Sequence, residues 1–182
     1  MPRRPGRDAG GVVLLALGGS DCEALRDGVL GQPANTVSSL AYLAAAAYVL
    51  RKGGPPGPAV ALALVGVGSV LYHGPMPPGA ELVHDASLLA IPVAALAVAW
   101  RRRSFPRPPT AAVVALALAA VANVLSRTGA PLCRPDSLLQ RHAVWHVLTA
   151  VGAALWLARW PPAGSGAENA HPSIDARRPP GP

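Results

Sequence analysis

Charged residues are scarce in this chain of 182 residues: they make up 14% of it, against roughly 25% in soluble domains. Lysine is nearly absent, since it occurs once beside fifteen arginines, a bias that suggests a GC-rich bacterial genome. Apolar residues make up 51%, and they occur in blocks of alanine, valine and leucine. The composition therefore favours a membrane protein over a soluble one, and one domain is the expected number at this length.

The excess of basic residues does not indicate a nucleic-acid-binding protein, although the formal net charge is +7. Arg51 and Lys52 directly follow one apolar block, and Arg101, Arg102 and Arg103 directly follow another. Basic residues at the ends of apolar blocks are typical of the cytoplasmic loops of membrane proteins. We therefore expect no nucleic-acid partner, and we expect these two loops to be cytoplasmic.

Five apolar segments approach the length of a membrane-spanning helix, which is about 17–25 residues. They are bounded by proline, glycine or arginine, and they cover residues 35–50, 58–72, 80–100, 110–125 and 138–160. The sequence thus predicts an all-α membrane protein, a bundle of about five transmembrane helices in a bacterial plasma membrane. These helices form a transmembrane domain over residues 21–160.

The two ends of the chain differ from this domain. Residues 1–20 combine three arginines with a short apolar run at 11–17, which resembles a signal sequence but is too short to span a bilayer. Residues 161–182 are polar and rich in proline and glycine, so we expect a disordered cytoplasmic tail there.

Histidines gather at one end of the predicted bundle. His73 ends the second segment, four residues after Ser69, and His142 and His146 open the fifth segment, also four residues apart. That spacing places each pair on one helical face. Because the second segment ends on the side of the membrane where the fifth begins, we expect the three histidines to meet near the non-cytoplasmic face. Three neutral imidazoles beside an open position are typical of catalytic zinc.

Other readings of these residues stay open. Asp85 begins the third segment at the same face and could take a proton during hydrolysis, whereas its neighbour His84 is interpreted as an interfacial residue outside the site. The histidines could instead form polar contacts between helices, or hold haem in an electron carrier. Covalent haem is disfavoured because the chain has no Cys-x-x-Cys-His motif.

The order and spacing of these motifs resemble the alkaline ceramidases and the wider CREST superfamily of membrane hydrolases. The resemblance covers about residues 21–160, because Asp21-Cys22-Glu23 and the stretch from Gln32 to Leu40 also resemble the start of that family. It implies a zinc-dependent hydrolase that cleaves an amide bond in a ceramide-like or other acyl-amide lipid. A receptor-like or metal-binding member without enzymatic activity is the alternative.

The resemblance also assigns roles to individual residues. It implies that zinc is bound by His73, His142 and His146. It further implies that Asp85 activates the attacking water and that Ser69 orients this water or stabilises the oxyanion.

The chain departs from the family in two respects. The family has seven spans, and two helices between the third and the last segment are missing here, which leaves ceramide specificity open. The family also has a calcium site in its N-terminal segment. Asp21 and Glu23 remain from that site, but Leu25 and Gln32 stand where further oxygen ligands are expected. We therefore expect a weakened or lost calcium site.

Cysteine is limited to two residues, Cys22 and Cys133. The expected orientation places both on the non-cytoplasmic side, where disulfides persist, and ceramidases join the same two segments by a disulfide. We therefore predict a Cys22–Cys133 disulfide that holds the N-terminal segment over the metal site. Two free thiols are the alternative if that side faces the cytoplasm.

Overall fold

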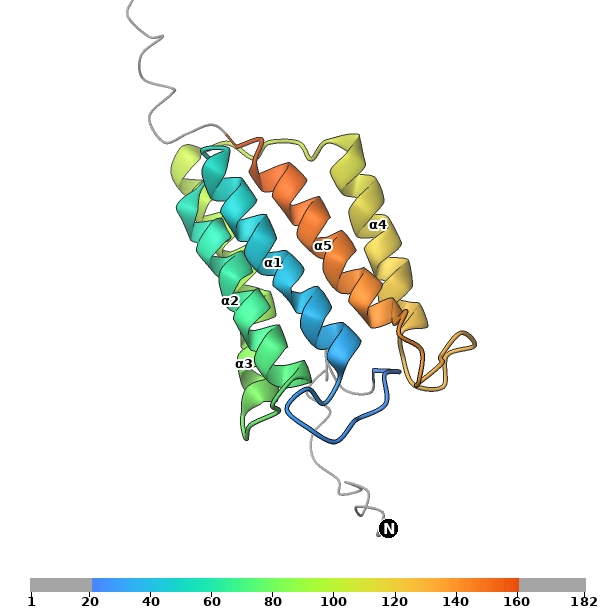
Figure 1. Ribbon diagram of the computed structural model, residues 1–182. Coiled ribbons are helices and arrows are strands. Elements are labelled where there is room, and N and C mark those ends of the chain that lie inside the picture. The colour runs from blue at the N-terminus through green and yellow to red at the C-terminus, as the bar shows by residue number, and fades with distance from the viewer. Residues whose placement is uncertain (1–20, 161–182) are drawn as a thin grey trace, which may run out of the picture.

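The computed structural model describes residues 21–160, which fold into five α-helices (Figure 1). The helices are α1 (Pro33–Arg51), α2 (Pro56–His73), α3 (Ala80–Arg102), α4 (Thr110–Leu125) and α5 (Arg141–Leu157). Within the described residues the only β contact is one isolated bridge, so the predicted all-α fold is confirmed. The predictions for residues 1–20 and 161–182 lie outside the described part of the chain.

The ends of the helices follow from local sequence. A proline lies in the first turn of α1 and of α2, where its missing N–H removes no helical hydrogen bond. The fifth helix is shorter than the predicted segment 138–160, because Leu138 and Leu139 are 83% and 73% exposed in a loop. Gln140 closes this loop: its side-chain amide donates to the carbonyl oxygens of Arg134, Pro135 and Ser137 at 3.1, 3.2 and 2.6 Å.

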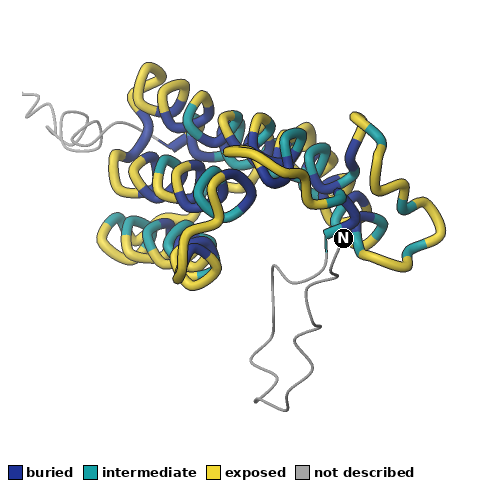
Figure 2. The backbone as a smooth tube through the Cα atoms, turned by 60° about the horizontal axis from the view of Figure 1, so that its bottom comes forward, coloured by how far each residue is buried: buried dark blue, intermediate teal, exposed yellow. Residues whose placement is uncertain are grey.

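The helices pack in an order that differs from their order in the chain. Helix α2 packs against α1 and α3, and α5 packs against α1 and α4, which gives the spatial order α3–α2–α1–α5–α4. The last helix therefore lies between the first and the fourth (Figure 1). Buried residues follow the inner sides of the helices and exposed residues their outer sides (Figure 2).

Helices α1, α3 and α5 begin at the same end of the bundle, where α2 and α4 end (Figure 1). We call this the histidine end, because His73, His84 and His142 lie there. The opposite end, the arginine end, carries Arg51 and Arg102 at the ends of α1 and α3. The basic loops used to predict the orientation are thus at one end of the molecule and the histidines at the other.

Small residues let the helices approach each other closely. A Cβ atom on Gly68 of α2 would lie 2.9 Å from Ser87 Oγ and 3.3 Å from the Cα atom of His84, both in α3. Helix α4 turns four buried alanines inward, Ala112, Ala115, Ala119 and Ala122. Packing of this kind, with small side chains between helices, is common in membrane bundles.

Two helices, α2 and α3, are long and apolar enough to cross a membrane, with 18 residues at mean hydropathy 1.3 and 23 residues at 1.9. Helix α4 is apolar but shorter. Two such helices are weak evidence on their own, because the core helix of a soluble protein passes the same test. The five helices of the prediction are present.

Candidate metal centre

His73, His142 and His146 converge at the histidine end of the bundle. His73 is the last residue of α2, and the other two lie in the first two turns of α5. Their ring centroids are 4.5 to 5.1 Å apart, and none of the three residues is more than 2% exposed. One ligand nitrogen from each ring lies within 4.8 Å of the others, so the three histidines could hold a metal ion.

The Nδ1 atom of His73 faces a hydrogen-bond acceptor, whereas that of His142 lies within ion-pair distance of a carboxylate and 3.4 Å from its hydrogen-bond partner Ser126 Oγ, which donates its own proton to the carbonyl oxygen of Asn123. His73 Nδ1 lies 2.6 Å from Gln32 Oε1, and His142 Nδ1 lies 3.0 Å from Asp21 Oδ1. The Gln32 amide is oriented because its Nε2 donates to the carbonyl oxygen of Glu23 at 2.9 Å. A neutral imidazole that donates from Nδ1 carries its lone pair on Nε2.

The Nδ1 atom of His146 likewise faces oxygen atoms, those of two serine hydroxyls in α1. Its Nδ1 lies 2.9 Å from Ser38 Oγ and 3.4 Å from Ser39 Oγ. Both hydroxyls donate their own protons to the carbonyl oxygen of Asn35, at 3.0 and 2.6 Å. The serine oxygens therefore accept from His146 Nδ1, which leaves the lone pair of this ring on Nε2. Ser69 Oγ lies 3.4 Å from that Nε2 atom.

These contacts prepare the three rings for a metal. The Nε2 atoms of His73 and His142 are buried without a hydrogen-bond partner, which costs free energy in the absence of a ligand. Metal-binding histidines characteristically donate their other ring N–H to an oxygen, which fixes the ring. The residues present thus fit a metal ion, although imidazole alone does not select zinc over copper, iron or nickel.

The two carboxylates assigned to a weakened calcium site, Asp21 and Glu23, contact different groups. Asp21 faces the histidines, and burial raises the pKa of its carboxyl to about 7, against an opposing effect of the charge on Arg127. Glu23 accepts backbone N–H groups of Ala34 and Asn35 at 2.8 and 2.9 Å, and so satisfies the first turn of α1. This arrangement gives a physical reason for the expected weakening of calcium binding.

The predicted disulfide between Cys22 and Cys133 is present, with a Cα–Cα distance of 5.5 Å. It ties the segment before α1 to the loop before α5. Backbone hydrogen bonds hold the same segment to the ends of α4 and α2, from Cys22 N to Ser126 O and from Gln32 N to His73 O, both at 2.8 Å. Residues 21–32 therefore cover the histidine end of the bundle, next to the three rings.

Of the two predicted catalytic residues, Ser69 lies beside the three histidines and Asp85 lies outside their cluster. Ser69 is buried beside His146. Asp85 is outside the three-ring cluster, with its Oδ1 atom 2.9 Å from Nδ1 of His84 and its side chain 26% exposed. His84, interpreted from the sequence as interfacial, is 1% exposed, and its ring centroid lies 5.8 Å from that of His73. The one signal that could have pointed to His84 was its position beside Asp85 at the histidine face.

Sequence reasoning also missed the oxygen partners of the three rings. These are Asp21 and Gln32, which precede α1, and Ser38 and Ser39 within it. Their role depends on where the first segment folds, and no spacing within that segment signals a contact with α5.

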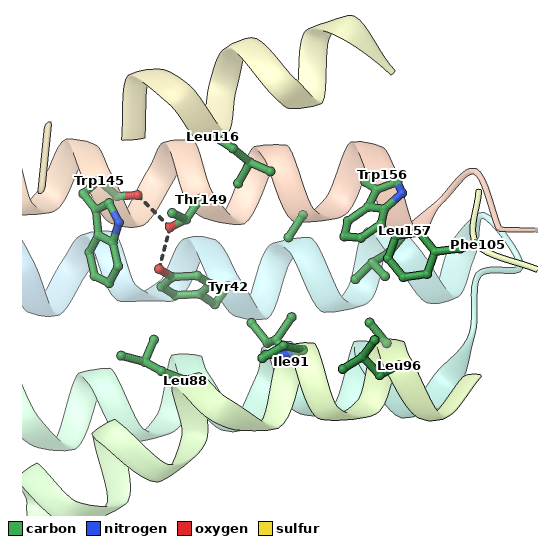
Figure 3. Close-up of a pocket in the computed structure, with 13 residues that line it drawn as sticks. Tyr42, Leu88, Ile91, Leu96, Phe105, Leu116, Trp145, Thr149, Trp156 and Leu157 are labelled. Carbon is green, nitrogen blue, oxygen red and sulfur yellow. Dashed lines mark hydrogen bonds between the residues drawn. The ribbon is translucent and has the colours of Figure 1, made fainter. Parts of the chain in front are cut away.

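An apolar cavity of about 400 Å³ begins beside the metal centre (Figure 3). At one end, the ring of Tyr42 lies 5.8 Å from His146 and that of Trp145 lies 4.9 Å from His142. At the other end, Phe105 and Trp156 are in contact, 5.2 Å apart. From Trp145 to Trp156, α5 rises roughly 16 Å, so the cavity is long as well as apolar.

The chain matches no model of a known protein family, no curated protein and no solved structure. The resemblance to the alkaline ceramidases therefore depends on the motifs themselves. The disulfide and the meeting of His73, His142 and His146 agree with what that resemblance implies for the arrangement of the chain.

Proposed function

We propose that this protein is a membrane-embedded, zinc-dependent hydrolase that cleaves the amide bond of a ceramide-like or other acyl-amide lipid. The observation that carries the proposal is the three-histidine centre, in which the Nε2 atoms of His73 and His142 are buried without a partner. Structural zinc sites have four protein ligands, whereas three imidazoles leave a position for water or substrate. The centre is therefore suited to catalysis.

The apolar cavity supports a lipid substrate. It is lined mainly by residues of α1, α3, α4 and α5. Figure 3 shows two hydrogen bonds in it, one between the hydroxyls of Tyr42 and Thr149 at 2.6 Å and one from the Thr149 hydroxyl to the carbonyl oxygen of Trp145 at 2.7 Å. An acyl chain in this cavity would place its carbonyl carbon at the end where Trp145 contacts His142 and His146. A long apolar cavity that begins beside the centre favours a substrate with a long apolar tail.

The exterior of the bundle supports a membrane setting. On α3, Leu82, Leu89 and Val93 are 74, 59 and 64% exposed, and on α4, Val121 and Val124 are 56 and 69% exposed. Large apolar side chains outside and buried imidazoles inside suit a lipid environment better than water. With the arginine end in the cytoplasm, the metal centre lies near the non-cytoplasmic face of a bacterial plasma membrane.

Each group near the centre has a defined part in the proposed reaction. When bound to His73, His142 and His146, zinc supplies a Lewis acid that polarises the amide carbonyl. Asp21, Gln32 and Ser38 hold the three rings in position. Ser69 presents a hydroxyl that can donate to the carbonyl oxygen as negative charge develops on it. Asp85 helps to activate the attacking water.

The geometry favours a single ion over haem. The three ring centroids are 4.5 to 5.1 Å apart, and this spacing leaves no room for a porphyrin between them. A metal-binding protein without enzymatic activity shares the same centre, and the experiment below separates it from a hydrolase.

The test combines metal analysis with a lipid panel. Protein purified gently in detergent should contain one zinc per chain, and it should release fatty acid from ceramides or other acyl amides but not from matched acyl esters. His142→Ala should lose most of the metal and the activity, because three ligands become two. His171→Ala, which removes a histidine outside the described residues, is the matched control and should keep both.

Two results would contradict the proposal in different ways. If the wild-type protein contains no metal, the proposed metal centre and the proposed hydrolysis are both wrong. Stoichiometric zinc without hydrolysis of any lipid amide would leave the metal centre in place and favour the non-enzymatic alternative.

A further inference from the structure

We propose that His84 is a further catalytic residue of this centre and that Asp85 is the residue that positions it. The inference rests on the proposed function. His84 lies near the start of α3, and it is 1% exposed. Its ring centroid lies 5.8 Å from that of the metal ligand His73. It is not one of the residues whose ligand atoms meet within 4.8 Å, so it stands beside the metal ligands.

The contact with Asp85 decides which nitrogen of His84 is free. Asp85 Oδ1 lies 2.9 Å from His84 Nδ1, and an ionised carboxylate only accepts hydrogen bonds. The Nδ1 atom therefore donates, and the lone pair of the neutral ring is on Nε2. That Nε2 atom is buried and has no partner in the described part of the chain. A buried acceptor beside a metal centre can receive a hydrogen bond from the water that attacks the substrate.

Neighbouring groups fix the ring of His84 and connect it to polar surroundings. It stacks on Tyr72 at 4.8 Å between centroids, with 25° between the ring planes. Tyr72 in turn lines a cavity of about 660 Å³ together with Asp21, Gln32 and Glu81. This second cavity has a polar lining at the histidine end, so it offers a route for water to the side of the centre where His84 lies.

The proposed step is a balanced hydrolysis. His84 Nε2 takes a proton from water as the water oxygen forms a bond with the carbonyl carbon of the amide. The C–N bond then breaks, and the proton passes from His84 to the leaving nitrogen, which gives a carboxylic acid and an amine. Asp85 stays ionised throughout and stabilises the protonated ring, as the carboxylate of a His–Asp pair does in other hydrolases.

The test separates His84 from a metal ligand and from a structural residue. His84→Gln and His84→Ala should keep stoichiometric zinc but lose about 10²–10⁴-fold in turnover. Added imidazole should restore part of the activity of His84→Ala, where it can occupy the space of the missing ring, and none in His84→Gln. Ser87→Ala, which shortens another buried side chain one turn along α3, is the control and should retain activity.

A spectroscopic measurement makes the test independent of the substrate. With cobalt in place of zinc, the pH midpoint of the visible absorption should move by about one unit or more in both His84 variants and stay unchanged in Ser87→Ala. Full turnover in His84→Gln, loss of metal from His84→Ala, or an unchanged cobalt midpoint would overturn the assignment. If wild-type protein binds metal but cleaves no lipid amide, the proposed function fails while the cobalt midpoint still decides the role of His84.

Discussion

The Nδ1 atom of each histidine in the centre faces an oxygen of a different chemical kind. His142 faces a carboxylate, His73 faces a side-chain amide, and His146 faces hydroxyls whose protons are already donated. Among these partners, Asp21 contacts two ligands, because its second oxygen lies 3.7 Å from His73 Nδ1. Burial also raises the pKa of its carboxyl to about 7. Among these partners, loss of Asp21 should therefore reduce the affinity for the metal most.

Asp21→Asn should lower the affinity for zinc by about 10–100-fold, which is the usual effect of losing such a partner. An amide keeps the size of the side chain but removes the charge that lies 3.0 Å from His142 Nδ1 and 3.7 Å from His73 Nδ1. Competition with a chromophoric chelator measures the affinity. Asp27→Asn alters an exposed aspartate of the same segment and should have no effect. Equal affinity in the two variants would show that Asp21 does not support the metal ligands.

Among the elements, the contact between α2 and α3 bears most directly on the centre. It brings together His73, at the end of one helix, and His84, near the start of the other. The two helices approach closely at Gly68, where a side chain would press on the backbone of α3, including the carbonyl oxygen of Val83 at 3.3 Å. A backbone contact cannot relax by rotation of a side chain, so the separation of the two helices is set by glycine at this position.

Gly68→Ala should therefore lower the thermal stability of the bundle and reduce activity, through displacement of α3 and His84. Overpacking of this kind costs about 1–3 kcal/mol. Gly57→Ala is the matched control in the same helix, because nothing lies within 4 Å of its added Cβ atom. It should be neutral or slightly stabilising, since alanine favours helix over glycine. Equal melting temperatures for the two variants, measured in one detergent, would contradict the close contact.

The elements also separate what a sequence can predict from what it cannot. Apolar runs closed by proline, glycine or arginine located all five helices, and the same spacing placed His142 and His146 on one face. Leu138 and Leu139 extended the fifth run into a loop, because hydropathy does not register the hydrogen bonds that Gln140 makes there. The partners of the rings come from another segment, and their contacts arise only when residues 21–32 fold over the histidine end.

At the scale of the whole molecule, the two ends of the bundle differ in chemistry. The histidine end carries the metal centre and the disulfide, and the arginine end carries basic loops and the contact between Phe105 and Trp156. Helix α3 connects the two ends, so its flanking loops should lie on opposite sides of the bilayer.

Single cysteines introduced at Pro77 and Ser104 should report this orientation. Pro77 precedes α3 and should react with a membrane-impermeant maleimide added outside intact cells, whereas Ser104 follows α3 and should react only after the cells are opened. The native cysteines are paired and do not interfere. Labelling of both positions from the same side would contradict the proposed transmembrane arrangement.

Removal of the disulfide should destabilise the folded bundle and loosen the metal. Cys22 and Cys133 are 111 residues apart in sequence, and closing a loop of that size contributes up to about 4–5 kcal/mol in the chain-entropy model. A bilayer already confines the unfolded chain, so we expect a smaller loss. The Cys22→Ser/Cys133→Ser variant should melt at a lower temperature and release zinc faster to a chelator. Alkylation of unreduced, denatured wild-type protein should find no free thiol.

The central place of α5 gives this protein an order of assembly. Two of the three metal ligands and one half of the disulfide belong to the last part of the domain to leave the ribosome, while their partners in α1 and α2 are made first. Four helices are therefore made before α5 can take its place between α1 and α4. A chain interrupted before Arg141 keeps Cys133 but lacks His142 and His146, so it retains one of the three metal ligands.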